Sequence, residues 1–390
     1  MPYFNLSNGI RAVILTALFI FSPEINTQAQ QKLGLWVVRD QLANRNKIDT
    51  FIDFAAQNRI SELFVQIRGR GDAFYFSDLV APSENMTESS WDPLTYTLDK
   101  AHAKNLRVHV WLNAFLLWSA EQRPQDHRHL LYQHPDWCAV DADGVKDIQK
   151  QPADFRRNGT EGIYLSPLVP QVREYLLSVI REILTKYPID GVHLDYVRYA
   201  KDCYDYNPIG RKLFRDRYGV DPLLLTISDK SLFKGWELGN LETLQEQWSA
   251  FRREAVSDFI QACAGLIDTQ TRPILLSAAV KPDPGEARQY FFQDWEHWLR
   301  QGWLDFAVLM NYYRGTEQFE NVLKKISPQI QKERLWVGIG VYNLNKYDAL
   351  SRILVTLNNQ FGNLVFFSYD TFQRNPDYFP ILQKALLINH

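Results

Sequence analysis

The residues best suited to chemistry stand in IDGVHLDYVRY, the segment from Ile189 to Tyr199. Its apolar residues have the spacing of a buried strand, yet the strand pattern runs directly into Asp195 and Arg198. Because side chains alternate between the two faces of a strand, His193 and Asp195 share one face. A carboxylate beside a guanidinium suits a nucleophile or a base, whereas an apolar wall raises its pKa and suits an acid. The segment therefore predicts a reactive carboxylate at Asp195.

Polar side chains also stand where other strand-like segments end. They are Gln66, Arg68, Arg70 and Asp72; His109, Trp111 and Asn113; Lys281 and Asp283; Asn311, Tyr312 and Arg314; and Tyr369 and Asp370. Burying one such group without a partner costs roughly 1–3 kcal/mol, so a packed core has no use for so many. A ring of stabilising salt bridges is the structural alternative. We expect substrate contacts from Arg68, Arg70, Trp111, Asn113, His193, Arg198, Asn311 and Asp370.

Hydrolysis of a glycosidic bond would use such a rim, because it requires two carboxyl groups. A separation of about 5–5.5 Å suits retention of configuration and about 6.5–9.5 Å suits inversion. Asp195 is the first candidate and Asp72 the named second one, although an ion pair with Arg68 or Arg70 is the favoured role for Asp72. The other carboxylates that remain open as the second group are Glu161, Asp283, Glu286 and Asp370.

The elements that must position these residues repeat a simple order. Eight apolar segments rich in β-branched and aromatic residues cover 33–38, 62–68, 107–113, 190–195, 274–280, 305–312, 335–342 and 363–369. Near-continuous apolar runs are typical of parallel strands covered on both faces, and amphipathic helical patterns separate them. The pattern predicts an α/β fold, a closed (β/α)8 barrel. An open doubly wound sheet is the alternative, but no Gly-rich phosphate turn follows the first segment.

Two connections of this predicted barrel are long, 114–167 after the third strand and 199–248 after the fourth. Loops at the carboxyl ends of barrel strands build active sites. His193 and Asp195 would then point into the barrel near this mouth. Asp190 would lie at the entrance of its strand, where a turn or a backbone contact is the expected role.

Five segments together resemble the successive motifs of glycosyl hydrolase-like family 10. They are QIRGRGDAFY, AHAKNLRVHVWLN, YLSPLVPQVREYL, DGVHLDYVRY and GWLDFAVLMNYY, and the resemblance runs from about Leu33 to Asp370. It implies a (β/α)8 barrel, export from the cytoplasm and hydrolysis of glycosidic bonds, with action on peptidoglycan strands in some bacterial members. This chain has Tyr196 where many members carry a second carboxylate, and Ser166 where many have Asn before the proline.

Tyr312 offers a route that needs one carboxylate only. LMNYY is similar to the strand-six Met-x-Tyr of family-18 chitinases, in which the N-acetyl carbonyl of the sugar attacks and a Tyr orients it. The Asp-x-Asp-x-Glu of those enzymes is absent here. Flat rings also stack on sugars, and Trp111 is the favoured stacking candidate, with Trp118, Trp137, Tyr312 and Tyr313 left open.

The substrate expected is therefore a polysaccharide, with an N-acetylated glycan such as peptidoglycan leading. Two alternatives stay open, a barrel that binds carbohydrate without cleaving it and a glycosidase acting on an α-glucan or an exopolysaccharide.

The N-terminus has the pattern of a secretory signal peptide. Arg11 precedes the apolar run from Ala12 to Phe21, and a small-residue cleavage site ends at Ala29. The expected domains are a signal peptide over residues 1–29 and the barrel over residues 30–390. The mature protein is expected to be secreted or periplasmic, with no stable membrane insertion.

Composition excludes several other classes of protein. The 390 residues carry a net charge of −2, which offers no basic surface for nucleic acid. Cys138, Cys203 and Cys263 lack zinc-ligand spacing, and their disulfide state and the oligomeric state stay open. No metal or cofactor motif is present, and the Gly-x-Ser-x-Gly of serine hydrolases is missing.

Overall fold

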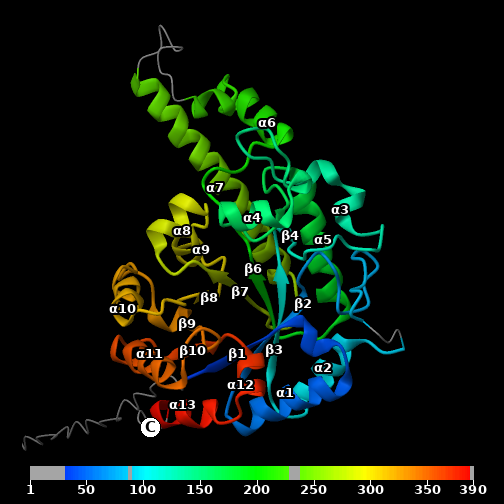
Figure 1. Cartoon of the computed structure of the whole chain (residues 1–390), viewed down its shortest axis with the longest axis vertical. Helices are drawn as coiled ribbons and strands as arrows, with labels where there is room; N and C mark the ends of the chain where they lie inside the picture. Colours follow the sequence, from blue (N-terminus) through cyan, green and yellow to red (C-terminus); the bar gives the residue numbers. More distant parts are fainter. Residues whose placement is uncertain (1–30, 87–89, 228–237, 387–390) are drawn as a thin grey trace, which may run out of the picture. The chain divides into compact units, whose positions relative to one another are not determined.

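A computed structural model describes residues 31–86, 90–227 and 238–386 (Figure 1). The predicted signal peptide lies outside these residues. The central element is a closed parallel barrel in the order β1-β10-β9-β8-β7-β6-β3-β2. Its strands are β1 Leu33–Val37, β2 Glu62–Arg68, β3 Arg107–Asn113, β6 Gly191–Asp195, β7 Leu275–Val280, β8 Phe306–Leu309, β9 Leu335–Ile339 and β10 Asn363–Phe366. The predicted fold class is thus confirmed, and the last three strands end earlier than their apolar patterns do.

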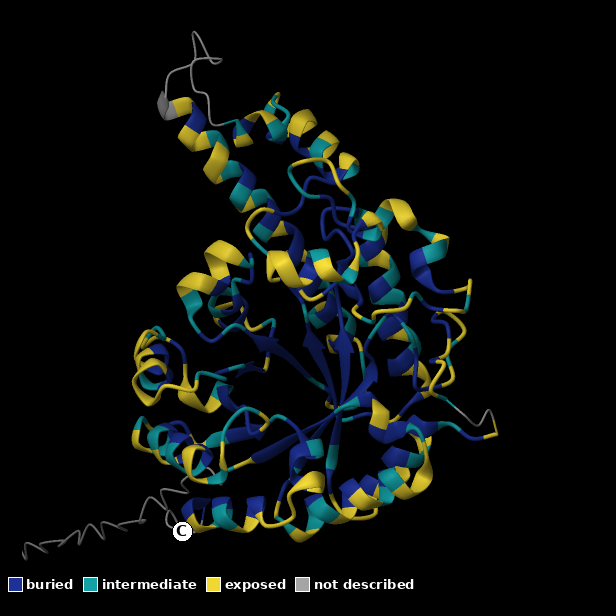
Figure 2. Cartoon of the chain, viewed as in Figure 1, coloured by how far each residue is buried: buried dark blue, intermediate teal, exposed yellow. Residues whose placement is uncertain are grey.

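Helices surround the barrel and cover its outer face. In Figure 2 the sides of these helices that face the barrel are buried, and the sides that face away from it are exposed. They are α1 Arg45–Gln57, α2 Pro93–His102, α3 Leu130–Gln133, α4 Pro152–Asn158, α5 Pro170–Lys186, α6 Pro208–Tyr218, α7 Leu238–Asp268, α8 Pro284–Tyr290, α9 Trp295–Arg300, α10 Thr316–Lys324, α11 Lys346–Asn358, α12 Tyr369–Arg374 and α13 Tyr378–Leu386. Short polar residues start several of them; the Asn44 side chain, for example, accepts the N–H of Lys47 at the start of α1.

The barrel interior is filled by large side chains. One buried cluster inside the barrel includes Trp36, Phe64, Phe306 and Trp336. This packing follows from the alternation of side chains, because every second residue of each strand faces the axis. The interior is therefore a packed floor, and a substrate can approach only from the ends of the strands.

The two long connections form the structure above this floor, as predicted. After β3, the chain makes a two-stranded antiparallel ribbon from β4 Leu116–Trp118 and β5 Ile163–Tyr164, with α3 and α4 between them. After β6 it forms α6, which leads to the 31-residue α7. Figure 1 shows these insertions around the arrowheads of β3 and β6.

Asp190 lies at the opposite end of the barrel. Its Oδ2 accepts the backbone N–H of Val108 at 2.7 Å and lies 2.8 Å from Nε2 of His102. The contact at the strand entrance expected from the sequence is confirmed.

The cysteines and the helices add two simple findings. All three thiols are free, with Cys138 and Cys263 buried and Cys203 exposed. Within the described ranges, no helix is both long and apolar enough to cross a membrane.

Candidate active site

The carboxyl end of β6 presents Asp195 in a nearly closed environment. The residue is 7% exposed, and its Oδ1 accepts the backbone N–H of Tyr196 at 2.7 Å. Burial raises the pKa of Asp195 to about 6, although the Tyr196 N–H and the charge of Arg198 act in the opposite direction. Asp195 is therefore a carboxyl group that keeps its proton up to about pH 6, above the range of an ordinary aspartate.

Tyr196 leaves the strand in an unusual backbone conformation. Its φ is +50°, in the left-handed region that bulky residues rarely adopt. Conformations of this kind cost about 1–3 kcal/mol and persist where the surroundings hold them. Here the turn presents the Tyr196 N–H to Asp195 and lays the Tyr196 ring 4.8 Å from the guanidinium carbon of Arg198.

The second carboxylate of the site is Glu161, which comes from the long connection after β3. Its Oε1 lies 2.7 Å from Nη2 of Arg198, and its Oε2 accepts the hydroxyl of Tyr164 at 2.8 Å. Burial opposes the charge of Glu161, but Arg198 and the Tyr164 hydroxyl more than offset this effect and hold its pKa below the usual range. The charge of Glu161 in turn raises the pKa of Asp195. Near pH 6, therefore, Asp195 is about half protonated while Glu161 is ionised.

Glu161 reaches this position because the chain just before β5 packs very closely against the end of β4. A Cβ atom placed on Gly162 would lie 2.1 Å from the carbonyl oxygen of Trp118, so only glycine fits there. The side chain of Glu161 remains 35% exposed and faces solvent as well as Arg198. In the sequence analysis Glu161 is one of several carboxylates that remain open as the second catalytic group. The glycine that follows Glu161 is the feature of the sequence that indicates this close packing.

Three further side chains contribute to the mouth. Burial lowers the pKa of Lys281 to about 8, and the charge of Arg198 acts in the same direction. Burial also raises the pKa of Tyr312 well above its usual value, and the charge of Asp195 raises it further. The phenol of Tyr312 therefore stays protonated. Among the described residues the Tyr312 hydroxyl has no recorded hydrogen-bond partner. The ring of Tyr342, which the sequence analysis did not single out, is edge-on to Tyr312 and 54% exposed.

Two predicted substrate contacts, His193 and Asn311, are instead enclosed by protein. His193 lies between the indole N–H of Trp36, at 3.1 Å, and the Ser277 hydroxyl, at 2.9 Å, in the barrel floor. Asn311 donates to the carbonyl of Phe319 at 2.9 Å. Both side chains are buried and bonded to protein groups, so neither lies free at the mouth in this structure.

Arg68 is also enclosed, for a different reason. The register of β2 against β3 shifts between Gln66 and Arg68, which interrupts the simple alternation of side chains. Arg68 is 0% exposed and donates to the backbone carbonyl of Asn113. It supports the end of β3 and does not line the mouth.

Trp111 and Asn113 also have supporting roles. The indole N–H of Trp111 donates to Oδ1 of Asn113 at 3.0 Å, and Nδ2 of Asn113 donates to the Gly69 carbonyl at 2.7 Å. Both side chains are buried, so Trp111 has no free ring face for stacking. Asp370, which follows β10, accepts from the Gln41 amide at 2.8 Å and from the Ser368 hydroxyl at 2.9 Å.

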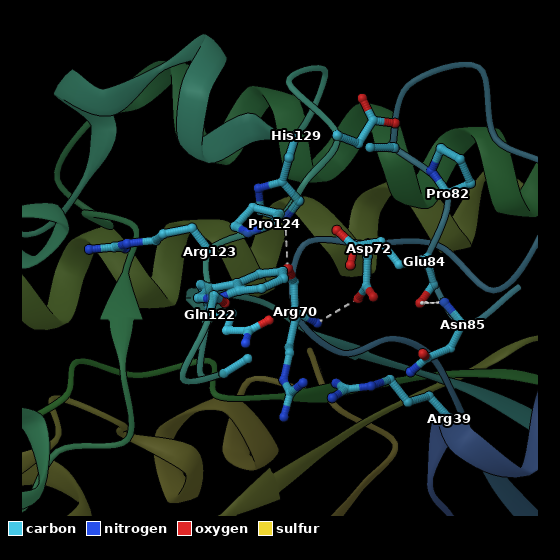
Figure 3. Close-up of a pocket in the computed structure, with 15 residues that line it drawn as sticks. Arg39, Arg70, Asp72, Pro82, Glu84, Asn85, Gln122, Arg123, Pro124 and His129 are labelled. Carbon is cyan, nitrogen blue, oxygen red and sulfur yellow. Dashed lines mark hydrogen bonds between the residues drawn. The ribbon is translucent and has the colours of Figure 1, made fainter. Parts of the chain in front are cut away.

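Arg70 and Asp72 line a separate pocket beside the site, shown in Figure 3. Asp72 accepts the backbone N–H of Arg70 at 2.9 Å. The charges that act on Asp195 come principally from Arg198, Glu161 and Lys281, and Asp72 is not among them. The structure therefore joins Asp195 with Glu161 and Arg198, and it places Asp72 in other surroundings.

Comparisons with known proteins agree with this architecture. The family described as glycosyl hydrolase-like 10 matches residues 30–352. Glycosyl hydrolase DigH of Escherichia coli K12 is 23% identical over 318 residues, which cover 76% of this chain and 65% of DigH. Glycosyl hydrolase YngK of Bacillus subtilis is 24% identical over 356 residues, which cover 85% of this chain and 61% of YngK. The chain thus spans less than two thirds of the length of these relatives.

Solved structures share the fold. The glycoside hydrolase domain of PgaB (BpsB) from Bordetella bronchiseptica superposes with a TM-score of 0.60 at 15% identity, covering 90% of this chain and 97% of that domain. The catalytic domain of a β-amylase from Paenibacillus polymyxa gives 0.54 at 10% identity, covering 91% and 98%. Both likenesses show a (β/α)8 barrel of the kind that glycosidases use.

Proposed function

The chain belongs to the glycosyl hydrolase-like 10 family, and from this premise we propose that it hydrolyses O-glycosidic bonds of a polysaccharide with Asp195 as general acid. One observation carries the proposal: two neighbouring carboxyl groups have pKa values displaced in opposite directions. The pKa of Asp195 is raised to about 6, and that of Glu161 is lowered. Groups separated in this way can supply the acid and the ionised partner that glycoside hydrolysis requires.

In this mechanism each residue has a defined task. Asp195 donates its proton to the departing glycosidic oxygen. Glu161, ionised beside Arg198, acts as the base or the nucleophile. In the sequence analysis Asp72 is the named second carboxylate, with an ion pair favoured as its role. Arg198 is a positioning residue, because its guanidinium is buried and bound to Glu161. Tyr312 presents a protonated hydroxyl without a recorded partner in the described ranges, which can orient an N-acetyl group of the sugar.

The substrate we propose is an N-acetylated glycan such as peptidoglycan strands. Tyr312 supports an N-acetylated sugar, and the exposed ring of Tyr342 supports stacking on its apolar face. The apolar run before residue 30 supports export, with residues 1–29 removed and the mature enzyme secreted or periplasmic. A polysaccharide outside the cytoplasm is consistent with that location.

The test compares purified wild type with Asp195→Asn and Glu161→Gln on N-acetylated glycan strands, with and without stem peptides, beside an α-glucan panel. Products are identified by mass spectrometry. We expect each substitution to reduce turnover by about 10²–10⁴-fold, because general acid–base groups contribute that much. Glu317→Gln, an exposed carboxylate at the start of α10, is the matched control and should keep the wild-type rate.

Two results would contradict the assignment. An Asp195→Asn protein with an unchanged circular dichroism spectrum and near-wild-type turnover would remove Asp195 from the chemistry. Loss of turnover in Asp72→Asn together with full activity in Glu161→Gln would return the second role to Asp72.

A second candidate function is a barrel that binds carbohydrate without cleaving it. Tyr196 favours it, because the family resemblance implies a second carboxylate at this position and this chain has a tyrosine there. Under this alternative an oligosaccharide stays intact over days with wild-type protein while binding is retained. Cleavage of α-glucans alone would instead identify a different glycan as the substrate of the same site.

A further inference from the structure

A buried ionic cluster lies in the long connection after β3, outside the site described above. Asp147 begins the 3-10 helix Asp147–Gln149 and is 0% exposed. Nζ of Lys150 lies 3.1 Å from Oδ1 of Asp147 and 2.8 Å from Oδ2 of Asp141. Tyr204 comes from the connection after β6, and its hydroxyl donates to Oδ1 of Asp147 at 2.8 Å and accepts from Lys150 at 2.6 Å. Asp147, Lys150 and Tyr204, here called the Asp147 cluster, thus join the two long connections.

Stability alone is a poor reason for this cluster. Charges taken out of water cost free energy, and a buried ion pair is often no more stabilising than apolar residues of the same volume. The pKa of Asp147 reflects that cost, because burial raises it to about 6 although the charge of Lys150 and the hydroxyl of Tyr204 act in the opposite direction. The best-attested use of such a cluster is to fix one arrangement of the chain. The remaining contact of Asp147 indicates which arrangement that is.

The second oxygen of Asp147 binds the backbone of Tyr164 in β5. Its Oδ2 accepts the N–H of Tyr164 at 3.2 Å. The carbonyl of Tyr164 accepts the N–H of Ala139 at 2.8 Å, and the N–H of Asp147 donates to the carbonyl of Ala139 at 2.8 Å. The side chain of Tyr164 is buried, so its hydroxyl cannot move independently of this backbone. Asp147 therefore sets the position of the Tyr164 hydroxyl.

The hydroxyl of Tyr164 is one of the two groups that hold Glu161. It donates to Oε2 of Glu161 at 2.8 Å, while Oε1 lies 2.7 Å from Nη2 of Arg198. Arg198 comes from the end of β6 and Tyr164 from β5, so each carboxylate oxygen is fixed from a different side. Hydrogen bonds thus connect Tyr204 with Asp147, Asp147 with Tyr164, and Tyr164 with Glu161.

We propose that the Asp147 cluster positions Glu161 for catalysis, acting through Tyr164. Asp147, Lys150 and Tyr204 are positioning residues, because in the described ranges none of them has a recorded contact with Glu161. The inference rests on the proposed function, since it assumes that Glu161 is the ionised partner of Asp195. It makes the carboxylate supplied by one long connection depend on a tyrosine of the other.

The first test is Asp147→Asn, which keeps the size of the side chain but has one acceptor oxygen. That oxygen can serve Tyr164 or the Lys150 and Tyr204 side, but not both. We expect kcat to fall roughly 10- to 100-fold with KM within about twofold of wild type, because small displacements of a catalytic group have effects of this size. The acidic limb of kcat/KM should move up toward the range of an ordinary glutamate, because the Tyr164 hydroxyl then does less to lower the pKa of Glu161.

A double-mutant comparison shows whether this effect passes through Tyr164. Tyr164→Phe removes the hydroxyl that holds Glu161 and leaves the backbone N–H that Asp147 accepts. In the Tyr164→Phe background, Asp147→Asn should lower kcat by no more than about twofold further, because the connection to Glu161 is already cut. Losses that simply add would overturn the proposal, because the cluster would then only stabilise the fold.

Asp205→Asn is the matched control. Asp205 is also a 0% exposed carboxylate in the connection after β6, and its Oδ1 accepts the backbone N–H of Val140 in the other connection at 2.9 Å. It therefore joins the same two segments, but has no recorded contact with Tyr164 in the described part of the chain. This variant should lose stability to urea as Asp147→Asn does, yet keep the kcat of wild type. An equal loss of kcat in both variants would overturn the positioning role.

Crystal structures give a reading that does not require turnover. In Asp147→Asn we expect the hydroxyl of Tyr164 and Oε2 of Glu161, 2.8 Å apart in wild type, to separate beyond hydrogen-bond distance. If Asp147→Asn does not fold, Tyr204→Phe replaces it, since that change removes only the hydroxyl between Asp147 and Lys150. An unchanged contact overturns the inference. This failure is distinct from near-wild-type turnover in Asp195→Asn, which overturns the proposed function.

Discussion

At the scale of single residues, Asp195 and Glu161 differ because of what surrounds them. Asp195 is enclosed beside aromatic rings, while Glu161 is bound to a guanidinium and remains partly open to solvent. Burial favours the neutral form of a carboxyl group, and an adjacent positive charge favours the ionised form. Two residues of the same chemistry can therefore act as acid and base within one site.

This difference predicts the pH dependence of kcat/KM. If Asp195 must be protonated, activity should fall about tenfold per pH unit above its pKa of about 6. On the acidic side, activity should be lost only at a pH below the usual pKa range of a glutamate, because the pKa of Glu161 is lowered. A pH–rate profile from about pH 3 to pH 9 checks both limbs. Activity that instead rises through pH 6 to a plateau would mean that Asp195 acts in its ionised form.

At the scale of elements, the ribbon of β4 and β5 decides where Glu161 lies. The close approach of Gly162 to the Trp118 carbonyl fixes the residue after Glu161 against the end of β4. The register shift in β2 has a comparable effect, since it places Arg68 in the wall. Irregular elements, more than ideal strands, thus determine which side chains reach the mouth.

Gly162→Ala should displace the ribbon and move Glu161 from its position. We expect kcat/KM to fall by roughly 100-fold, because small displacements of a catalytic group have effects of this size. Gly144→Ala is the matched control: Gly144 belongs to the same connection and also has a positive φ, but a Cβ atom there meets nothing within 4 Å. Steady-state kinetics of both variants, with circular dichroism as a check on folding, tests the claim. Equal losses in the two variants would attribute the effect to backbone strain alone.

At the scale of the whole molecule, the burial of Asp195 lowers the stability of the fold at neutral pH. A buried carboxyl group whose pKa is raised binds its proton more tightly in the folded state than in the unfolded state. As pH rises from about 4 to above 6, the folded state becomes less stable relative to the unfolded state. A molecule selected for stability alone would not place a carboxylate there.

Asp195→Asn should therefore be more stable than wild type near pH 7.5. The expected gain in the free energy of unfolding is up to roughly 3 kcal/mol, from a displacement of the pKa from 3.8 to about 6. The gain should vanish near pH 4, where Asp195 is protonated in the folded state. Other groups with displaced pKa values, such as buried His193, are present in both proteins and largely cancel. Urea unfolding at the two pH values measures this, and a gain of equal size at both would contradict it.

The sequence by itself determined the barrel and the place of Asp195. Both depend on local patterns: apolar runs of strand length, helical periodicity between them, and a charged residue where a strand stops. These signals lie within short windows of the chain, so they can be read without knowing which segments meet. The family motifs are local in the same sense, and the family was confirmed.

Only the tertiary structure decided which residues surround Asp195. Glu161 and Arg198 meet across 37 residues of chain, and Trp36 meets His193 across 157. The enclosure of Arg68, His193 and Asn311 also depends on contacts between distant segments. Burial, charge and pKa are set by such contacts, and spacing along the chain does not encode them. The sequence could therefore identify the polar residues at the strand ends. The packing of the folded chain decided which of them lie beside Asp195 and which are enclosed by the protein.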